Sequence, residues 1–101
     1  DIKNGIASLE GIPGRFERAT KDEKYEVIVD YAHTPDALEK LLEATRNITK
    51  KRIILVFGAC GDRDTLKRPI MGKIAAKLAD EIILTDEESY NENPDKIRRD
   101  M

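Results

Sequence analysis

The sequence has one cysteine, one histidine and no tryptophan. A single cysteine excludes a disulfide within the chain, and with one histidine it nearly excludes a dedicated transition-metal site. The 18 basic and 20 acidic residues leave a net charge of -2, which argues against nucleic-acid binding because that function requires a strongly basic surface. The longest apolar run, Ile53 to Phe57, is too short to span a bilayer. No export leader opens the chain, so we expect a cytoplasmic protein.

Three short apolar runs, at residues 27–29, 53–57 and 82–84, predict three β-strands. Each is apolar at consecutive positions, which is typical of strands covered on both faces of a parallel sheet. The segments from Pro35 to Ile48 and from about Pro69 to Ala79 have helical spacing, and Thr34 followed by Pro35 is a typical helix start. This alternation predicts an α/β fold: a Rossmann-like, open, mostly parallel sheet with flanking helices.

The two ends of the sequence predict further elements. We expect a short helical tail over residues 1–11, a stiff connector at 12–14 and an additional edge strand within 15–21. A third helix is expected to begin after Pro94. A sheet of three or four strands with an interrupted helix is thin for an independent domain, so we interpret the chain as a piece of a longer one.

Polar residues collect after each predicted strand, at positions 30–36, 58–69 and 85–91. In open α/β sheets, ligands bind beyond the carboxyl ends of the strands. Asp30 is placed to accept hydrogen bonds from ribose hydroxyls, Tyr31 offers a flat face, and His33 precedes a helix start suited to phosphate. Arg63, flanked by two aspartates, can bind a carboxylate through two hydrogen bonds. The sequence therefore predicts a binding surface, without a nucleophile, general base or metal cluster of its own.

Each of these features, taken alone, also has an ordinary structural explanation. Asp30 fits a turn, and a histidine in a loop such as His33 is more often solvated or capping than functional. Gly58 and Gly61 suit a tight turn but lack the third glycine of a dinucleotide fingerprint. Lys73 follows a glycine but precedes isoleucine, so this segment is not a P-loop.

Four strings taken in order resemble the C-terminal domain of the Mur ligase family. They are PGRFE at 13–17, DYAHTPD at 30–36, GACGDRD at 58–64 and KRP at 67–69. The resemblance covers essentially the whole chain and is strongest to the branch that adds the third amino acid of the peptidoglycan stem peptide. It implies that residues 1–14 are the end of a central domain with the interdomain linker, and that 15–101 form a C-terminal domain incomplete at its C-terminus.

The resemblance implies an ATP-dependent reaction. ATP phosphorylates the D-glutamyl carboxylate of UDP-N-acetylmuramoyl-L-alanyl-D-glutamate, and the amine of an amino acid then attacks the acyl phosphate. Mg²⁺ is bound mainly by the central domain, so this chain is expected to be inactive alone, and the C-terminal domain closes over the site to exclude water. Arg15, Asp30, Tyr31 and His33 match nucleotide-contacting positions, and Arg63 matches the arginine that holds the carboxylate of the incoming amino acid.

One segment departs from the family pattern. Members that add meso-diaminopimelate carry Asp-Asn-Pro-Arg after the third strand, and this arginine binds the distal carboxylate. An alignment without gaps puts residues 87–90 there, with Glu88 added and Tyr90 in place of the arginine. A distal ammonium would find a partner at Glu88 whereas a distal carboxylate would not, so we expect L-lysine, or another amino acid with a cationic end, to be preferred.

Two alternatives remain open. One is another amide ligase of the superfamily, such as a folylpolyglutamate synthetase, which shares an Asp-x-Ala-His element like residues 30–33 but is not expected to share the string at 61–69. The other is a stand-alone nucleotide-binding module, which the absence of a P-loop superficially supports.

Overall fold

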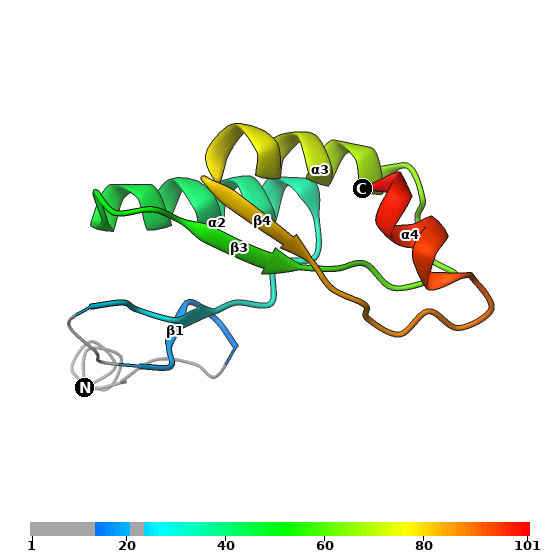
Figure 1. The fold of residues 1–101 in the computed structure, drawn as a ribbon, viewed down its shortest axis with the longest axis horizontal. Helices are drawn as coiled ribbons and strands as arrows, with labels where there is room; N and C mark the ends of the chain where they lie inside the picture. Colours follow the sequence, from blue (N-terminus) through cyan, green and yellow to red (C-terminus); the bar gives the residue numbers. More distant parts are fainter. Residues whose placement is uncertain (1–13, 21–23) are drawn as a thin grey trace, which may run out of the picture. The chain divides into compact units, whose positions relative to one another are not determined.

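The computed structural model describes residues 14–20 and 24–101, and the predicted helical tail lies outside these ranges. The chain divides into two compact units, residues 1–31 and 32–101. The first contains β1 (Glu17–Arg18) and β2 (Ile28–Val29). The second contains α2 (Pro35–Ile48), β3 (Ile54–Phe57), α3 (Lys67–Leu78), β4 (Glu81–Leu84) and α4 (Pro94–Asp100) (Figure 1).

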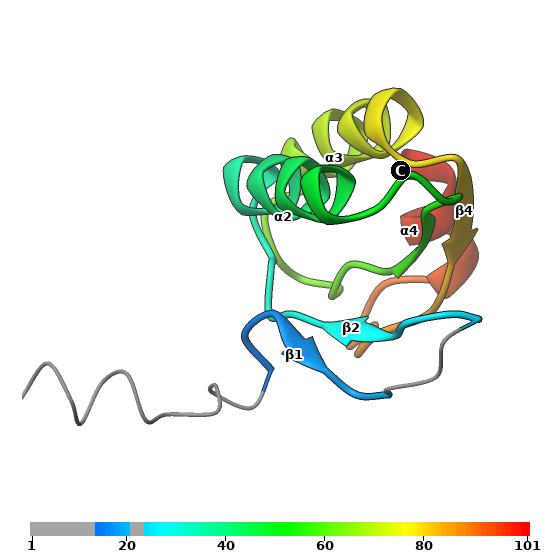
Figure 2. The same ribbon diagram turned by 90° about the vertical axis from the view of Figure 1, so that its left-hand side faces the viewer.

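The first unit is an antiparallel pair of short strands. Glu17 lies opposite Val29 and Arg18 opposite Ile28, so the predicted additional strand is present (Figure 2). Within the described residues of this unit, β2 pairs with β1. The β1–β2 pairing is antiparallel because the connection between these strands is too short for the crossover of about a dozen residues or more, usually helical, that a parallel pair needs.

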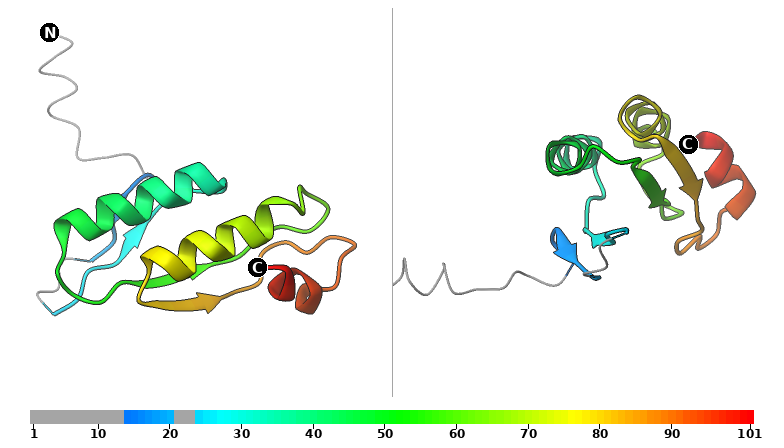
Figure 3. Two further views of the ribbon diagram at one scale, coloured as in Figure 1. Left: turned by 90° about the horizontal axis from the view of Figure 1, so that it is seen from above. Right: turned by 60° about the vertical axis from the view of Figure 1, so that its left-hand side comes forward.

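The second unit follows the predicted β-α-β pattern. Strands β3 and β4 pair in parallel, with Leu55 opposite Ile82, and α3 forms the crossover between them. Helices α2 and α3 lie side by side over one face of these strands (Figures 1 and 3). Their shared core consists of the buried residues Leu38, Leu42, Ile53, Leu55, Met71 and Ala75.

Two of the three described helices, α2 and α4, begin at or next to the residue that the sequence predicts. Thr34 caps α2, where its hydroxyl oxygen accepts a hydrogen bond from the Ala37 backbone N–H at 3.2 Å. Asn93 caps α4 in the same way, with its side-chain oxygen 2.8 Å from the Asp95 nitrogen. Helix α3 begins at Lys67, two residues before the predicted start, and its first turn therefore buries Arg68.

The two faces of the β3–β4 pair differ in exposure. Leu55 faces the helices and is buried, whereas Ile54, Val56 and Ile83 are about half exposed, at 48%, 57% and 47%. The prediction that these strands are covered on both faces therefore holds for one face only. Ile70 of α3 is also 49% exposed, because Arg68 and Met71 define the buried face of the first turns.

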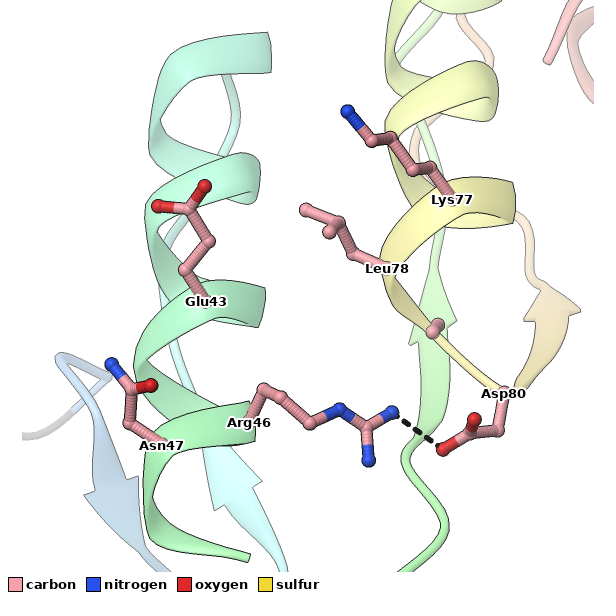
Figure 4. Close-up of a pocket in the computed structure, with 7 residues that line it drawn as sticks. Glu43, Arg46, Asn47, Lys77, Leu78 and Asp80 are labelled. Atoms are coloured by element: carbon pink, nitrogen blue, oxygen red, sulfur yellow. Dashed lines mark hydrogen bonds and ion pairs between the residues drawn. The ribbon is translucent and has the colours of Figure 1, made fainter. Parts of the chain in front are cut away.

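A carboxylate holds the amino end of the parallel strands together. The Asp80 carboxylate accepts a hydrogen bond from the Ile53 backbone N–H at 2.6 Å and another from the Arg46 guanidinium at 2.7 Å. These two bonds, the backbone one foremost, lower the pKa of Asp80. A shallow pocket opens beside this ion pair, lined by residues of α2 and by the end of α3 (Figure 4).

Truncation of the shared core is expected to destabilise the second unit. Leu42→Ala removes a side chain that is 2% exposed and should lower the free energy of unfolding by about 2–5 kcal/mol, measured by urea denaturation. Leu66→Ala is the matched control because Leu66 is 77% exposed, and its effect should stay below about 0.5 kcal/mol. Equal losses in the two variants would contradict the described packing.

Candidate functional site

Two loops meet at the carboxyl ends of β3 and β4. We call residues 58–66, after β3, the arginine loop, and residues 85–93, after β4, the acidic loop. The Gly61 N–H donates to the Glu88 carbonyl at 2.8 Å. A Cβ atom at Gly61 would lie 1.8 Å from the Ser89 carbonyl oxygen, so the contact requires glycine at this position. The structure thus brings together two of the three loops for which the sequence predicts a site.

Side chains reinforce this backbone contact. The Asp62 N–H donates to the Glu92 carboxylate at 2.6 Å, and the Asp62 carboxylate accepts from the Asn91 side-chain amide at 2.9 Å. Asp62 and Tyr90 both have positive φ angles, of 53° and 49°. Such backbone strain persists only where the surroundings hold it in place, and it is frequent at binding sites.

A buried cation lies beneath the two loops. The Arg68 side chain is fully buried, and its guanidinium donates to both Glu92 carboxylate oxygens at 3.0 and 2.7 Å. It also donates to the Asp100 carboxylate at 3.0 Å and to the Cys60 carbonyl at 3.2 Å. The hydrogen bonds from Arg68 and from the Asp62 N–H lower the pKa of Glu92 to about 2, and Glu92 in turn raises the pKa of Arg68.

The three residues predicted to bind an amino acid lie on these adjoining loops. The Arg63 guanidinium carbon is 5.9 Å from the centre of the Tyr90 ring, which is within the range of a cation–π contact. Glu88 lies two residues before Tyr90 and is exposed. The arrangement offers a cation supported by an aromatic ring, with an exposed carboxylate on the same loop as the ring.

Cys60 does not have the features of an activated thiol. Its Sγ atom lies 3.3 Å from the Glu87 carboxylate. The hydrogen bond to this carboxylate raises the pKa of the Cys60 thiol, with burial and charge repulsion adding to the effect. A thiol in such surroundings stays protonated at neutral pH and is a poor nucleophile.

Three of the predicted nucleotide-binding residues belong to the first unit. The Asp30 carboxylate accepts a hydrogen bond from the Phe16 N–H at 2.8 Å, where Phe16 has a positive φ of 47°. Asp30 therefore has the structural role of holding this turn, besides any role in ligand binding. The Arg15 guanidinium carbon lies 5.0 Å from the centre of the Tyr31 ring, so these two predicted residues are neighbours.

The fourth, His33, belongs to the second unit and has an exposed side chain. The Lys67 ammonium donates to the His33 carbonyl at 2.8 Å, which connects the start of α2 to the start of α3. Across the described ranges, no three His, Cys, Asp or Glu side chains are arranged to hold a metal ion. No helix in these ranges is both long and apolar enough to cross a bilayer.

Comparison with protein families identifies the fold. Residues 14–101 match the family model described as "Mur ligase, glutamate ligase domain". The chain belongs to the Mur ligase family. This domain has the α/β fold of the C-terminal domain of Mur ligases, as the sequence predicted.

Individual relatives agree with this assignment. The chain is 50% identical over 96 residues to the UDP-N-acetylmuramoyl-L-alanyl-D-glutamate–2,6-diaminopimelate ligase of Syntrophomonas wolfei and 52% identical over 101 residues to that of Gloeobacter violaceus. The alignments cover 95% and 99% of this chain but only 20% and 21% of these relatives. The chain therefore spans about a fifth of the length of the curated relatives it matches.

Solved structures of two Mur ligases contain a domain with the same fold. A structure of a UDP-N-acetylmuramoyl-L-alanyl-D-glutamate–2,6-diaminopimelate ligase superimposes with a TM-score of 0.80 at 39% identity, covering 97% of this chain and 20% of that one. The UDP-N-acetylmuramate-alanine ligase MurC from Thermotoga maritima superimposes with a TM-score of 0.64 at 31% identity, covering 89% and 19%.

The ion pair beneath the loops should make stability depend on pH. Because the pKa of Glu92 falls from 4.5 to about 2 on folding, its contribution is present above pH 4.5 and is lost as the pH falls towards 2. Unfolding followed by circular dichroism should show stability decreasing over this interval, and Glu92→Gln should weaken that dependence. The same acid dependence in the variant would show that Glu92 does not contribute to it.

Proposed function

We propose that this chain is the amino-acid-binding C-terminal domain of a cytoplasmic, ATP-dependent ligase. The ligase would join an amino acid to UDP-N-acetylmuramoyl-L-alanyl-D-glutamate in peptidoglycan synthesis, the precursor that the relatives' names specify. The observation that carries the proposal is the pairing of Arg63 with Tyr90 on two loops that are bonded to each other.

In this proposal Arg63 binds the α-carboxylate of the incoming amino acid. A planar guanidinium can hold a carboxylate through two parallel hydrogen bonds and so fix the direction of the attached amine. That direction matters because the amine has to attack an acyl phosphate formed elsewhere in the enzyme. The contact with Tyr90 supports the guanidinium on one side and leaves its hydrogen-bonding edge available.

The acidic loop is proposed to favour L-lysine. Lysine and meso-diaminopimelate both have a distal ammonium, but diaminopimelate carries an additional distal carboxylate. Glu88 suits the ammonium, whereas Tyr90 carries no positive charge to bind the distal carboxylate, and the neighbouring Arg63 is assigned to the α-carboxylate. The relatives are named as 2,6-diaminopimelate ligases, so the preference proposed here depends on Glu88 and Tyr90 and not on the family as a whole.

Arg15, Asp30, Tyr31 and His33 are proposed to contact ATP. The neighbouring Arg15 and Tyr31 combine a cation for phosphate with a flat ring for a base or sugar. Mg²⁺, which the family implies, does not fit the described residues because they offer no set of metal ligands. Its site is proposed to lie in the central domain, and the function of this chain would be to bind and orient the substrates.

The test is phosphate release by the full-length ligase that contains this chain. The assay supplies ATP, Mg²⁺ and the UDP-muramoyl dipeptide, with L-lysine and meso-diaminopimelate in parallel. We expect a higher kcat/KM with lysine. A preference for diaminopimelate would overturn the specificity, and no release with either amino acid would favour a related ligase with another acceptor.

Substitution of Glu88 and Tyr90 in the acidic loop tests their role in amino-acid specificity directly. The double variant Glu88→Asn with Tyr90→Arg should shift the kcat/KM ratio towards meso-diaminopimelate by about tenfold or more, because one interaction of about 1.4 kcal/mol changes affinity tenfold. Asn47→Arg, in the lining of the pocket at the amino end of the strands (Figure 4), adds the same single charge as Tyr90→Arg alone and should leave the ratio unchanged.

A tyrosine pair tests the proposed ATP contact. Tyr31→Ala should raise the KM for ATP by about three- to tenfold, because one stacking contact is lost, and should leave the KM for the amino acid unchanged. Tyr25→Ala is the matched control, since the two side chains are 60% and 61% exposed and both lie in the first unit. Identical KM values for ATP in the two variants would remove Tyr31 from the site.

A further inference from the structure

Arg68 cannot contact a substrate, yet its charge is retained in the interior. Its side chain has no exposed surface, and its Nε atom has no hydrogen-bond partner within the described part of the chain. A buried ion pair with an unsatisfied N–H is a poor way to gain stability, because an apolar side chain of similar volume often serves better. Its value must then lie in the geometry that it imposes on its partners.

Glu92 transmits that geometry to the arginine loop. One Glu92 oxygen accepts from the Arg68 guanidinium alone, while the other accepts from both the guanidinium and the Asp62 N–H. The fork of two parallel bonds fixes the plane of the carboxylate. The position of Asp62 is fixed with it, and Asp62 is the residue immediately before Arg63.

Asp100 is the second partner of Arg68 but has a different connection. Its carboxylate accepts from Arg68 and also pairs with Lys96 of α4 at 2.9 Å. None of its bonds reaches the arginine loop or the acidic loop. The two carboxylates therefore share one cation, and of the two only Glu92 bonds to the arginine loop, to which Arg68 also donates directly at the Cys60 carbonyl.

We propose that Arg68 and Glu92 are positioning residues that hold the arginine loop against the acidic loop and so set the place of Arg63 beside Tyr90. This inference rests on the proposed function, because it gives the pair a role in binding the amino acid. In this arrangement the position of Arg63 depends on the hydrogen bond from the backbone N–H of the preceding residue, Asp62, to Glu92. Loss of that bond would let Arg63 move and weaken capture of the amino acid.

The decisive comparison is between Glu92→Gln and Asp100→Asn in the full-length ligase. Each removes one negative partner of Arg68, and both should lower the melting temperature. Glu92→Gln should raise the KM for the amino acid by about tenfold, with the KM for ATP unchanged. Asp100→Asn should leave the KM for the amino acid within about twofold of the unchanged enzyme. Equal KM values in the two variants would overturn the positioning role.

Two further measurements complete the test. A surface variant avoids any loss of folding, and hydrogen exchange does not depend on activity. Asn91→Ala removes the exposed side-chain bond to Asp62 and should raise the same KM by about threefold, whereas no change would contradict the proposal. Hydrogen exchange at the Asp62 amide should accelerate in Glu92→Gln and not in Asp100→Asn. If exchange is equal in the two variants, the connection itself is wrong. If the unchanged enzyme releases no phosphate with any amino acid, the proposed function fails instead.

Discussion

The enclosure of the Arg68 guanidinium is the constraint on which the carboxyl end of the second unit depends. A charge removed from water has to be matched by carboxylates, and here Glu92 and Asp100 provide them. They come from segments far along the chain, so the cation determines where the acidic loop and α4 come to lie. The close approach at Gly72, where a Cβ atom would lie 1.7 Å from the Met101 carbonyl oxygen, brings the end of α4 within reach.

The two ends of the β3–β4 pair use carboxylates differently. At the amino end, Asp80 joins Arg46 to the Ile53 backbone, and its surroundings remain partly exposed. At the carboxyl end the corresponding cation, Arg68, is buried, and its partner Glu92 also accepts a hydrogen bond from the arginine loop. Ligands in open α/β folds bind beyond the carboxyl ends of strands, so the pocket beside Asp80 fits a structural role. A backbone N–H and a guanidinium lower the pKa of each carboxylate, with the Ile53 N–H contributing most at Asp80 and the Arg68 guanidinium contributing most at Glu92.

Local rules predicted the helices and the parallel strands well. Thr34 and Pro35 define the start of α2, and the apolar spacing that follows determines its buried face. The motif at 61–69 located the arginine loop, yet nothing in its pattern assigned a burial role to Arg68. Burial of this arginine depends on contacts with carboxylates from distant segments of the chain, and sequence spacing does not predict such long-range contacts. The antiparallel pairing of β2 escaped prediction because an apolar run carries no information about its partner strand.

Specificity in this domain can be separated into a shared part and a variable part. An α-carboxylate is common to every amino acid, and Arg63 is suited to it whatever the side chain. The distal end is different for each substrate, and in the proposed arrangement it meets the acidic loop, where substitutions are tolerated more readily than in the core. An arginine in place of Tyr90 would set two cations close together, whereas the tyrosine ring attracts the Arg63 guanidinium. On this argument Tyr90 offers no partner to a distal carboxylate and at the same time stabilises Arg63, the residue proposed to hold the α-carboxylate.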